Sequence, residues 1–178
     1  DTLIRSNAAV SILEKIISIS TSYLKDSVLS INPFGFRTYF RGKDNGDIKI
    51  LTSKGWSKVD RTEITKGIEY IDQYKIIVGR FVPSNGEMSV KPGDGYRVLT
   101  EPQILSPAEI NTETYIDTAV FSTLEEATNY KKYLLSKFAR FLLRQGITSV
   151  NVTRECFAFV PQQDFTSSSD IEIGRASC

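Results

Sequence analysis

The sequence contains no histidine, and only two of its 178 residues, Cys156 and Cys178, are cysteines. The missing imidazole excludes Ser-His-Asp and Cys-His nucleophilic sites, and also zinc sites that include histidine. Two cysteines do not make a disulfide framework, and no basic start followed by an apolar block and a small-residue cleavage site is present. Nothing in the sequence therefore indicates secretion, and a cytoplasmic location is the default expectation.

Long apolar runs are also absent. The most apolar stretches, around residues 12–19 and 133–143, are interrupted by serine, lysine or arginine, well before the roughly 20 residues that a membrane-spanning helix needs. With 40% hydrophobic and 24% charged residues, the composition is typical of a globular protein with a buried core. The net charge is only +1, so any affinity for nucleic acid must depend on where the charges lie.

Signatures of several enzyme classes are missing as well. No Glu-x-Lys tripeptide occurs, which disfavours the common metal-dependent nucleases. No glycine-rich loop after a strand is suited to S-adenosylmethionine or a nucleotide phosphate. Asn32-Pro33-Phe34 lacks the second proline and the following aromatic residue of the Asn-Pro-Pro-Tyr motif with which adenine methyltransferases hold a flipped base. We therefore expect no complete catalytic site, no bound cofactor and no metal site in this chain.

What is present predicts an α+β fold. Apolar residues at near-helical spacing predict a helix over residues 7–29, with Val10, Leu13, Ile17, Leu24 and Val28 on one face. Short apolar segments between turn residues predict a mixed or antiparallel central sheet over about residues 36–121. The expected strands cover residues 36–40, 47–52, 56–64, 75–80, 96–105 and 114–121. A loop is expected at residues 83–95, between the fourth and the fifth strand.

The last third of the sequence predicts helices again. Ser122 and Glu125 have the spacing of a capping box, so a long C-terminal helix should begin there and run to about Gln145, before Gly146. Thr153 is positioned to cap a short final helix through Val160.

The chain is expected to have three parts: a helical arm over residues 1–30, an α+β domain over residues 31–165, and a disordered tail over residues 166–178. The sequence begins at Asp1 without a methionine, which suggests a fragment of a longer protein. Residues 172–178 read like a translated frame of a sequencing adapter, and we give them no functional weight.

Two groups of basic residues are candidates for DNA binding. If the alternation of the strand at residues 36–40 continues to Arg41, then Arg37 and Arg41 would lie on one face near Tyr39, and Lys43 follows. An arginine fork can read guanine or clamp a phosphate, and a nearby ring can stack on a base. The alternative is an amphipathic strand with a solvated face.

The second group comes from an apolar strand and a helix. Lys75 and Arg80 lie at the two ends of the strand over residues 75–80. Lys137, Arg140 and Arg144 recur at helical spacing near the end of the predicted C-terminal helix. They are candidate phosphate contacts. The alternatives are residues that simply terminate a strand and the solvated back of a helix.

The order of several segments resembles the C-terminal part of the large restriction-modification methyltransferases that act on adenine. The resemblance covers nearly the whole chain up to about Phe165. The matching pieces are Asn-Pro-Phe-Gly-Phe-Arg-Thr-Tyr-Phe-Arg-Gly at residues 32–42, Tyr-Lys-Ile-Ile-Val-Gly-Arg at 74–80, Thr-Glu-Thr-Tyr at 112–115 with its strand, residues 133–143, and Asn-Val-Thr-Arg-Glu-Cys-Phe-Ala-Phe-Val-Pro at 151–161.

This resemblance implies that residues 31–165 form a target-recognition domain that binds double-stranded DNA. It also implies a parent enzyme with a methyltransferase catalytic domain in cis, which binds S-adenosylmethionine. Enzymes of this family are often fused to or paired with a restriction nuclease, and the sequence leaves open whether the parent also cleaves DNA. The flipped adenine would enter the catalytic domain, while this chain contacts bases and phosphates. A second interpretation stays open: a non-catalytic docking domain that packs on the methyltransferase or a partner subunit, with an exposed apolar patch on its first helix.

Overall fold

Two small sheets form the β part of the computed structural model, which describes residues 7–83 and 98–166. The first sheet has the strand order β2-β1-β5. β1 (Ile48–Thr52) pairs antiparallel with β2 (Gly55–Val59) and parallel with β5 (Glu109–Asn111). The strand predicted at residues 47–52 is confirmed. β5 has no counterpart among the predicted strands, because three residues are too few to show an alternating pattern.

The second sheet is antiparallel, with the order β4-β3-β6. Its central strand, β3 (Tyr74–Gly79), confirms the prediction of an apolar strand there. β6 (Tyr115–Phe121) also confirms a prediction, and β4 (Gln103–Leu105) is the end of a longer predicted strand. The α+β class is thus confirmed, although the β region consists of one mixed and one antiparallel sheet.

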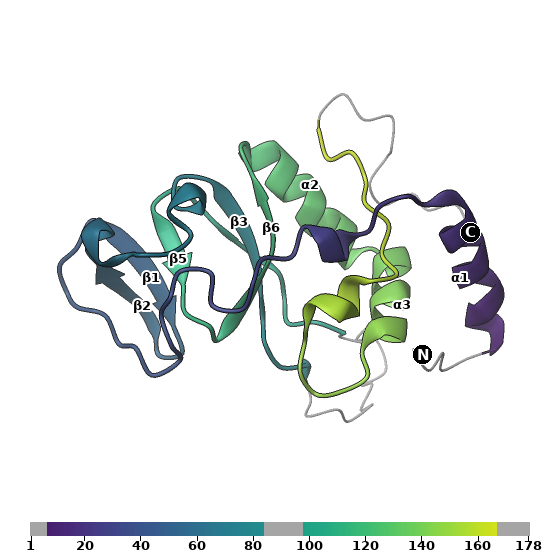
Figure 1. Ribbon diagram of the computed structural model, residues 1–178, viewed down its shortest axis with the longest axis horizontal. Coiled ribbons are helices and arrows are strands. Elements are labelled where there is room, and N and C mark those ends of the chain that lie inside the picture. The colour runs from purple at the N-terminus through teal and green to yellow at the C-terminus, as the bar shows by residue number, and fades with distance from the viewer. Residues whose placement is uncertain (1–6, 84–97, 167–178) are drawn as a thin grey trace.

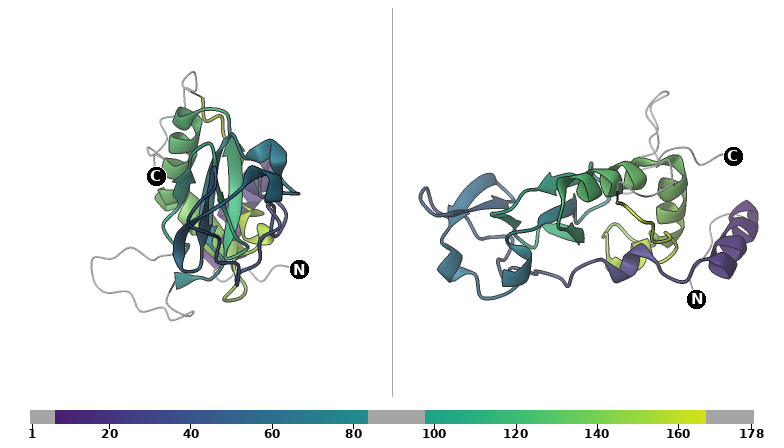
Figure 2. Two further views of the ribbon diagram at one scale, coloured as in Figure 1. Left: turned by 90° about the vertical axis from the view of Figure 1, so that its left-hand side faces the viewer. Right: turned by 90° about the horizontal axis from the view of Figure 1, so that it is seen from above.

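The elements are arranged along one long axis. Figure 1 shows the first sheet at one end, the second sheet in the middle with α2 (Leu124–Leu135) along it, and α3 (Lys137–Gly146) beyond; α1 (Asn7–Ile19) lies at the opposite end. The view from above in Figure 2 shows the same order. Three short 3-10 helices lie between these elements, and a fourth follows α3. They are η1 (Leu24–Asp26), η2 (Arg61–Glu63), η3 (Ile68–Tyr70) and η5 (Arg154–Phe157).

The two ends of the molecule have separate apolar core clusters. The large cluster joins the helices to one face of the second sheet, where Ile76 and Val78 of β3 are fully buried. Because side chains alternate along a strand, Ile77 faces the other way and packs with Leu51 of β1 and Leu105 of β4. This small contact is the apolar link between the two sheets.

The first helix ends earlier than predicted. α1 ends at Ile19, and the chain continues to η1, where Leu24 is buried in the large cluster. Among residues 10–19 of α1, Leu13 and Ile16 are buried, whereas Ile17 is 56% exposed. The predicted helical face was therefore wrong at Ile17, because the run Ile16-Ile17 satisfies two helical phases equally well.

The long C-terminal helix is interrupted. Ser136 has an extended backbone, with ψ of 152°, and separates α2 from α3. Its hydroxyl accepts a hydrogen bond of 3.1 Å from the backbone N–H of Ala139, so it caps α3. The start of α2 is also displaced by one residue, since Thr123 with Glu126 forms the capping box instead of Ser122 with Glu125.

The end of α3 lies against η5. A Cβ atom on Gly146 would be 2.5 Å from the carbonyl oxygen of Cys156, so only glycine permits this close approach. Thr153 begins η5 as predicted, but the helix ends at Phe157 and not at Val160. The loop predicted at residues 83–95 lies outside the described residues apart from Pro83, and so does the predicted tail after residue 166.

Candidate nucleic-acid interface

Residues 36–40 do not form the predicted strand. Glycines with positive φ stand on both sides of this segment, Gly35 at 86° and Gly42 at 71°, and turn the chain out of extended pairing. Phe36 and Phe40 pack together with ring centroids 4.5 Å apart and lie against the small core cluster of the first sheet. The segment is therefore a loop that is anchored by its two phenylalanines.

The anchored loop leaves its polar residues on the surface. Arg37 has a side chain that is 62% exposed, and Tyr39 is 77% exposed. Arg41 is exposed as well. Two guanidinium groups and one ring are thus accessible within five residues, which is the property that the sequence indicated, although a loop presents them in place of a strand.

Glu113, in the turn between β5 and β6, connects this loop to Arg80 at the end of β3. Its Oε2 is 3.1 Å from Nη1 of Arg37, and its Oε1 accepts a 3.2 Å hydrogen bond from the backbone N–H of Thr38. Its main-chain oxygen accepts from Nη1 of Arg80 at 3.2 Å. Arg41 joins the group because its Nη1 donates to the carbonyl of Thr38 at 3.3 Å.

We call Arg37, Arg41 and Arg80 the arginine cluster. Burial alone would raise the pKa of the Glu113 carboxyl, but the hydrogen bond from Thr38 and the Arg37 guanidinium hold that pKa below its ordinary value. The carboxylate is therefore ionised at neutral pH and offsets part of the positive charge. It also fixes Arg37 in one orientation.

Lys43 lies near this loop but faces acidic partners. Its ammonium group is within salt-bridge distance of Asp60 and, at 2.7 Å, of Glu63. Hydrogen bonds to these two carboxylates raise the pKa of Lys43. A phosphate would have to compete with both carboxylates, so Lys43 is a weaker candidate for DNA contact than the arginines.

Lys75 cannot contact DNA in this structure, which corrects the sequence-based assignment. The residue is fully buried, and its Nζ donates hydrogen bonds to the carbonyls of Tyr70, Ile71 and Gln73 at 2.9, 2.9 and 2.6 Å. Burial lowers the pKa of Lys75 to about 8. The side chain thus holds the turn after η3 against the second sheet.

The basic residues of α3 lie away from the arginine cluster. Figure 1 shows α3 on the helical side of the second sheet, while the loop after residue 36 lies beside the first sheet. Lys137 is exposed, whereas Arg140 and Arg144 are half-buried. Nε of Arg140 is enclosed and has no hydrogen-bond partner among the described residues. The predicted contact set therefore divides into two separate groups.

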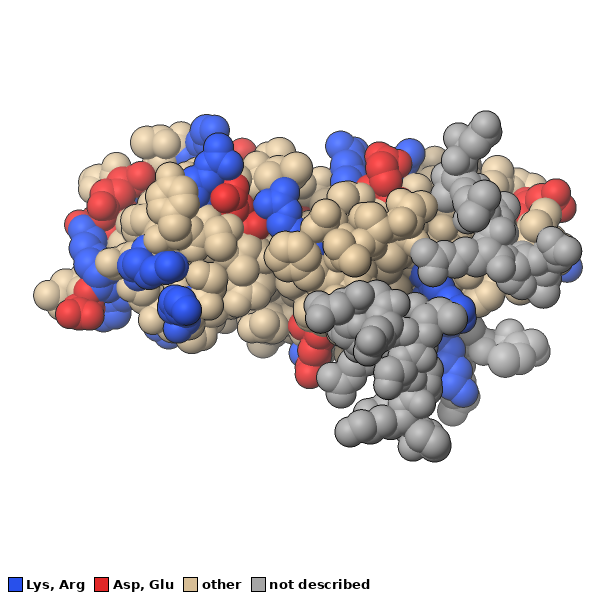
Figure 3. All heavy atoms as spheres, turned by 90° about the horizontal axis from the view of Figure 1, so that it is seen from below, with Lys and Arg blue, Asp and Glu red and all other residues tan. Residues whose placement is uncertain are grey.

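The surface carries no broad field of one sign on the face drawn in Figure 3. Lysines and arginines stand beside aspartates and glutamates at the end that carries β1 and β2, and much of the middle is uncharged. Recognition on such a surface depends on individual contacts more than on long-range attraction.

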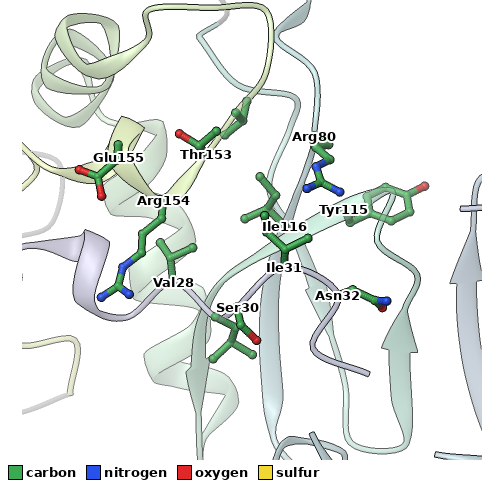
Figure 4. A pocket seen from close by; sticks show the side chains of 12 residues that line it. Val28, Ser30, Ile31, Asn32, Arg80, Tyr115, Ile116, Thr153, Arg154 and Glu155 are labelled. Atoms are coloured by element: carbon green, nitrogen blue, oxygen red, sulfur yellow. The ribbon is translucent and has the colours of Figure 1, made fainter. Parts of the chain in front are cut away.

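A pocket that the sequence did not reveal lies next to Arg80. It has a cavity volume of about 170 Å³ and is formed by the segment of residues 28–32, the ends of β3 and β6, and the loop of residues 152–155. In Figure 4, the Arg80 guanidinium points toward Ile31, Ile116 and Tyr115, while Arg154 lies on the opposite side. No local motif could have indicated the pocket, because its walls come from four separate parts of the chain.

Among residues 7–83 and 98–166, no group of three or more aspartate, glutamate or cysteine side chains could hold a metal ion. The same residues include no helix that is long and apolar enough to cross a membrane.

Comparisons of the chain with protein-family models, curated proteins and solved structures gave no match.

Proposed function

We propose that this chain recognises duplex DNA in the cytoplasm as the target-recognition region of a restriction-modification adenine N6-methyltransferase. The observation that carries the proposal is the arginine cluster. Three guanidinium groups from two distant segments meet around Glu113 and Thr38, beside the exposed ring of Tyr39. The order of segments that resembles this enzyme family supports the same function.

The cluster has the chemistry that base or phosphate recognition needs. Arginine can donate two parallel hydrogen bonds to guanine or to a phosphate. The contacts of Arg37 and Arg41 with the protein limit the freedom that each side chain loses on binding. In the proposed parent enzyme, the catalytic domain in cis would bind S-adenosylmethionine and the flipped adenine, and this chain would hold the adjoining duplex.

Salt-dependent binding to mixed-sequence duplex DNA tests the proposal. With about five phosphate contacts, affinity should fall by a few hundredfold between about 50 and 200 mM salt. Arg37→Ala and Arg41→Ala should each weaken binding, since each removes an exposed guanidinium. Lys132→Ala is the matched control, because Lys132 is exposed on α2 and belongs to neither candidate group. Equal affinity of all four proteins would remove the arginine cluster from the interface.

One observation favours the second function, a docking domain. Ile12, Ile17 and Ile19 of α1 are 41%, 56% and 79% exposed, and exposed apolar patches often mark protein interfaces. This function predicts no salt-dependent DNA binding by the chain at low salt. Binding to a methyltransferase catalytic domain should then be lost in an Ile17→Ser, Ile19→Ser variant and retained in Arg37→Ala.

A further inference from the structure

The pocket beside Arg80 has room for one six-membered ring. Its cavity volume is about 170 Å³. An apolar protein cavity of about 150 Å³ is known to hold one benzene molecule. A single six-membered ring such as that of a pyrimidine is therefore close to this space in size, whereas a purine would have to place a second, fused ring in it.

The pocket has more apolar than polar surface, and its polar lining residues are Ser30, Asn32, Arg80, Thr153, Arg154 and Glu155. Val28, Ile31, Ile116 and Val152 provide aliphatic surface, and Tyr115 contributes its ring. Arg80 points its guanidinium toward these side chains. Nη1 of Arg80 donates to the main-chain oxygen of Glu113, whereas Nε and Nη2 have no hydrogen-bond partner among the described residues. The pocket thus combines the hydrogen-bond donors of Arg80 with aliphatic surface beside them.

The position of the pocket connects it to the arginine cluster. Arg80 belongs to both, since the same guanidinium lines the pocket and donates to the carbonyl of Glu113, which holds Arg37. A duplex that contacts Arg37 and Arg41 would pass close to the pocket. Enzymes that act on one base of a pair displace that base, which leaves its partner without hydrogen bonds.

We propose that the pocket holds one pyrimidine base displaced from duplex DNA, with its ring between the aliphatic side chains and a carbonyl oxygen accepting hydrogen bonds from Arg80. Thymine fits best, because its C5 methyl group suits an apolar wall and both of its carbonyl groups accept. Thymine is also the partner of adenine. This inference rests on the proposed DNA-binding function.

An aromatic side chain of a partner protein has a ring of similar size. A phenylalanine would leave the free donors of Arg80 buried without acceptors, which is costly. The carbonyl groups of a pyrimidine satisfy them, and for this reason the base is the favoured occupant.

The test uses short duplexes that carry one unpaired residue in an otherwise identical sequence: thymidine, deoxyadenosine or an abasic spacer. Fluorescence anisotropy at fixed low salt gives the affinity for each, together with the fully paired duplex. We expect the thymidine bulge to bind about tenfold more tightly than the spacer bulge, which is within the range for one arginine–base contact. The deoxyadenosine bulge should gain little over the spacer.

Three variants assign this preference to the pocket. Arg80→Met should remove it, because the donors are lost. Ile31→Trp should also remove it by filling the space, and this change is at a residue that is 73% exposed and makes no side-chain hydrogen bond, so the fold should tolerate it. Arg154→Met is the matched control. Arg154 lines the pocket, but its guanidinium binds Asp26 and the carbonyl of Lys25, so the preference should stay.

The outcomes separate the two proposals. Equal binding of the thymidine and spacer bulges, with salt-dependent binding of the paired duplex, overturns the pyrimidine pocket and leaves DNA recognition standing. A preference for deoxyadenosine, or a thymidine preference that survives Ile31→Trp, overturns the pocket assignment in the same way. No binding of any duplex at low salt overturns both.

Discussion

Asp117 in β6 accepts a hydrogen bond of 2.9 Å from the side-chain amide of Asn111 in β5, so a buried carboxylate joins the two sheets. Its second oxygen, Oδ1, has no hydrogen-bond partner within residues 7–83 and 98–166. Lys75, which is also buried, interacts electrostatically with this carboxylate. The contact between the two sheets is therefore polar at Asp117 and apolar where Leu51, Ile77 and Leu105 meet.

Stability should decrease as pH rises from about 5 to 7. Burial raises the pKa of Asp117 to about 7 from its ordinary 3.8, so the folded protein binds a proton in this range that the unfolded chain has released. Folding is then favoured at low pH, and the advantage is lost as pH rises through the folded pKa. We expect urea unfolding to show a loss on the order of 1–3 kcal/mol across this range.

Asp117→Asn should make stability nearly flat over the same range. The chain has no histidine, so no other side chain with an ordinary pKa titrates there. Asp72→Asn is the control. A hydrogen bond from Arg61 lowers the pKa of Asp72, which places its effect at more acidic pH, and the decrease should persist. A flat profile for the unaltered protein would contradict the assigned role of Asp117.

Lys75→Met should destabilise the protein by about 2–4 kcal/mol, because three carbonyl groups lose their buried donor. Lys49→Met is the comparison, since Lys49 is exposed and makes a surface ion pair with Glu109 that should contribute less than about 1 kcal/mol. Urea unfolding at pH 7 measures both. Similar losses for the two variants would show that the three hydrogen bonds of Lys75 contribute little.

Glu113→Gln should strengthen DNA binding if the arginine cluster contacts DNA. The substitution removes the negative charge that offsets Arg37 and Arg80, and an interaction of about 1 kcal/mol corresponds to roughly fivefold in affinity. The salt dependence should also become steeper. Glu101→Gln, at an exposed residue paired with Lys131 of α2, should have no such effect. Weaker binding by Glu113→Gln would mean that Glu113 acts mainly by orienting the arginines.

Thr123→Ala should lower the free energy of unfolding by about 1 kcal/mol, since it removes the capping hydroxyl of α2. Ser122→Ala should change it by less than about 0.5 kcal/mol, because Ser122 is exposed and lies outside the capping box. The pair is well matched, as the two residues are adjacent and both lose one hydroxyl. Thermal or urea unfolding distinguishes them, and the opposite order would place the cap at Ser122.

The strands that were predicted correctly are those whose own residues determine their secondary structure. β3 is a continuous β-branched run and β1 alternates Ile48 with Ile50, so both were recognisable. The loop around Arg37 was mistaken for a strand because its aromatic residues favour strands locally. Its conformation depends instead on Gly35, on Gly42 and on the core beneath Phe36.

The candidate site was only partly predictable for a related reason. The exposure of Arg37, Tyr39 and Arg41 followed from their polar character, but the burial of Lys75 depends on carbonyls that η3 brings to it. Nothing near Glu113 in the sequence indicates that it meets Arg37 and Arg80. Such relationships depend on the packing of the two sheets, which a single sequence does not display.

The close contact between Gly146 and the carbonyl of Cys156 limits how this chain can evolve. Exposed residues on either sheet can be exchanged at little cost, whereas even a methyl group at residue 146 would displace η5 from α3. Across diverged sequences that share this architecture, a glycine at the last residue of α3 should persist when most of the surrounding residues have changed. It would serve as a fixed reference point for aligning them.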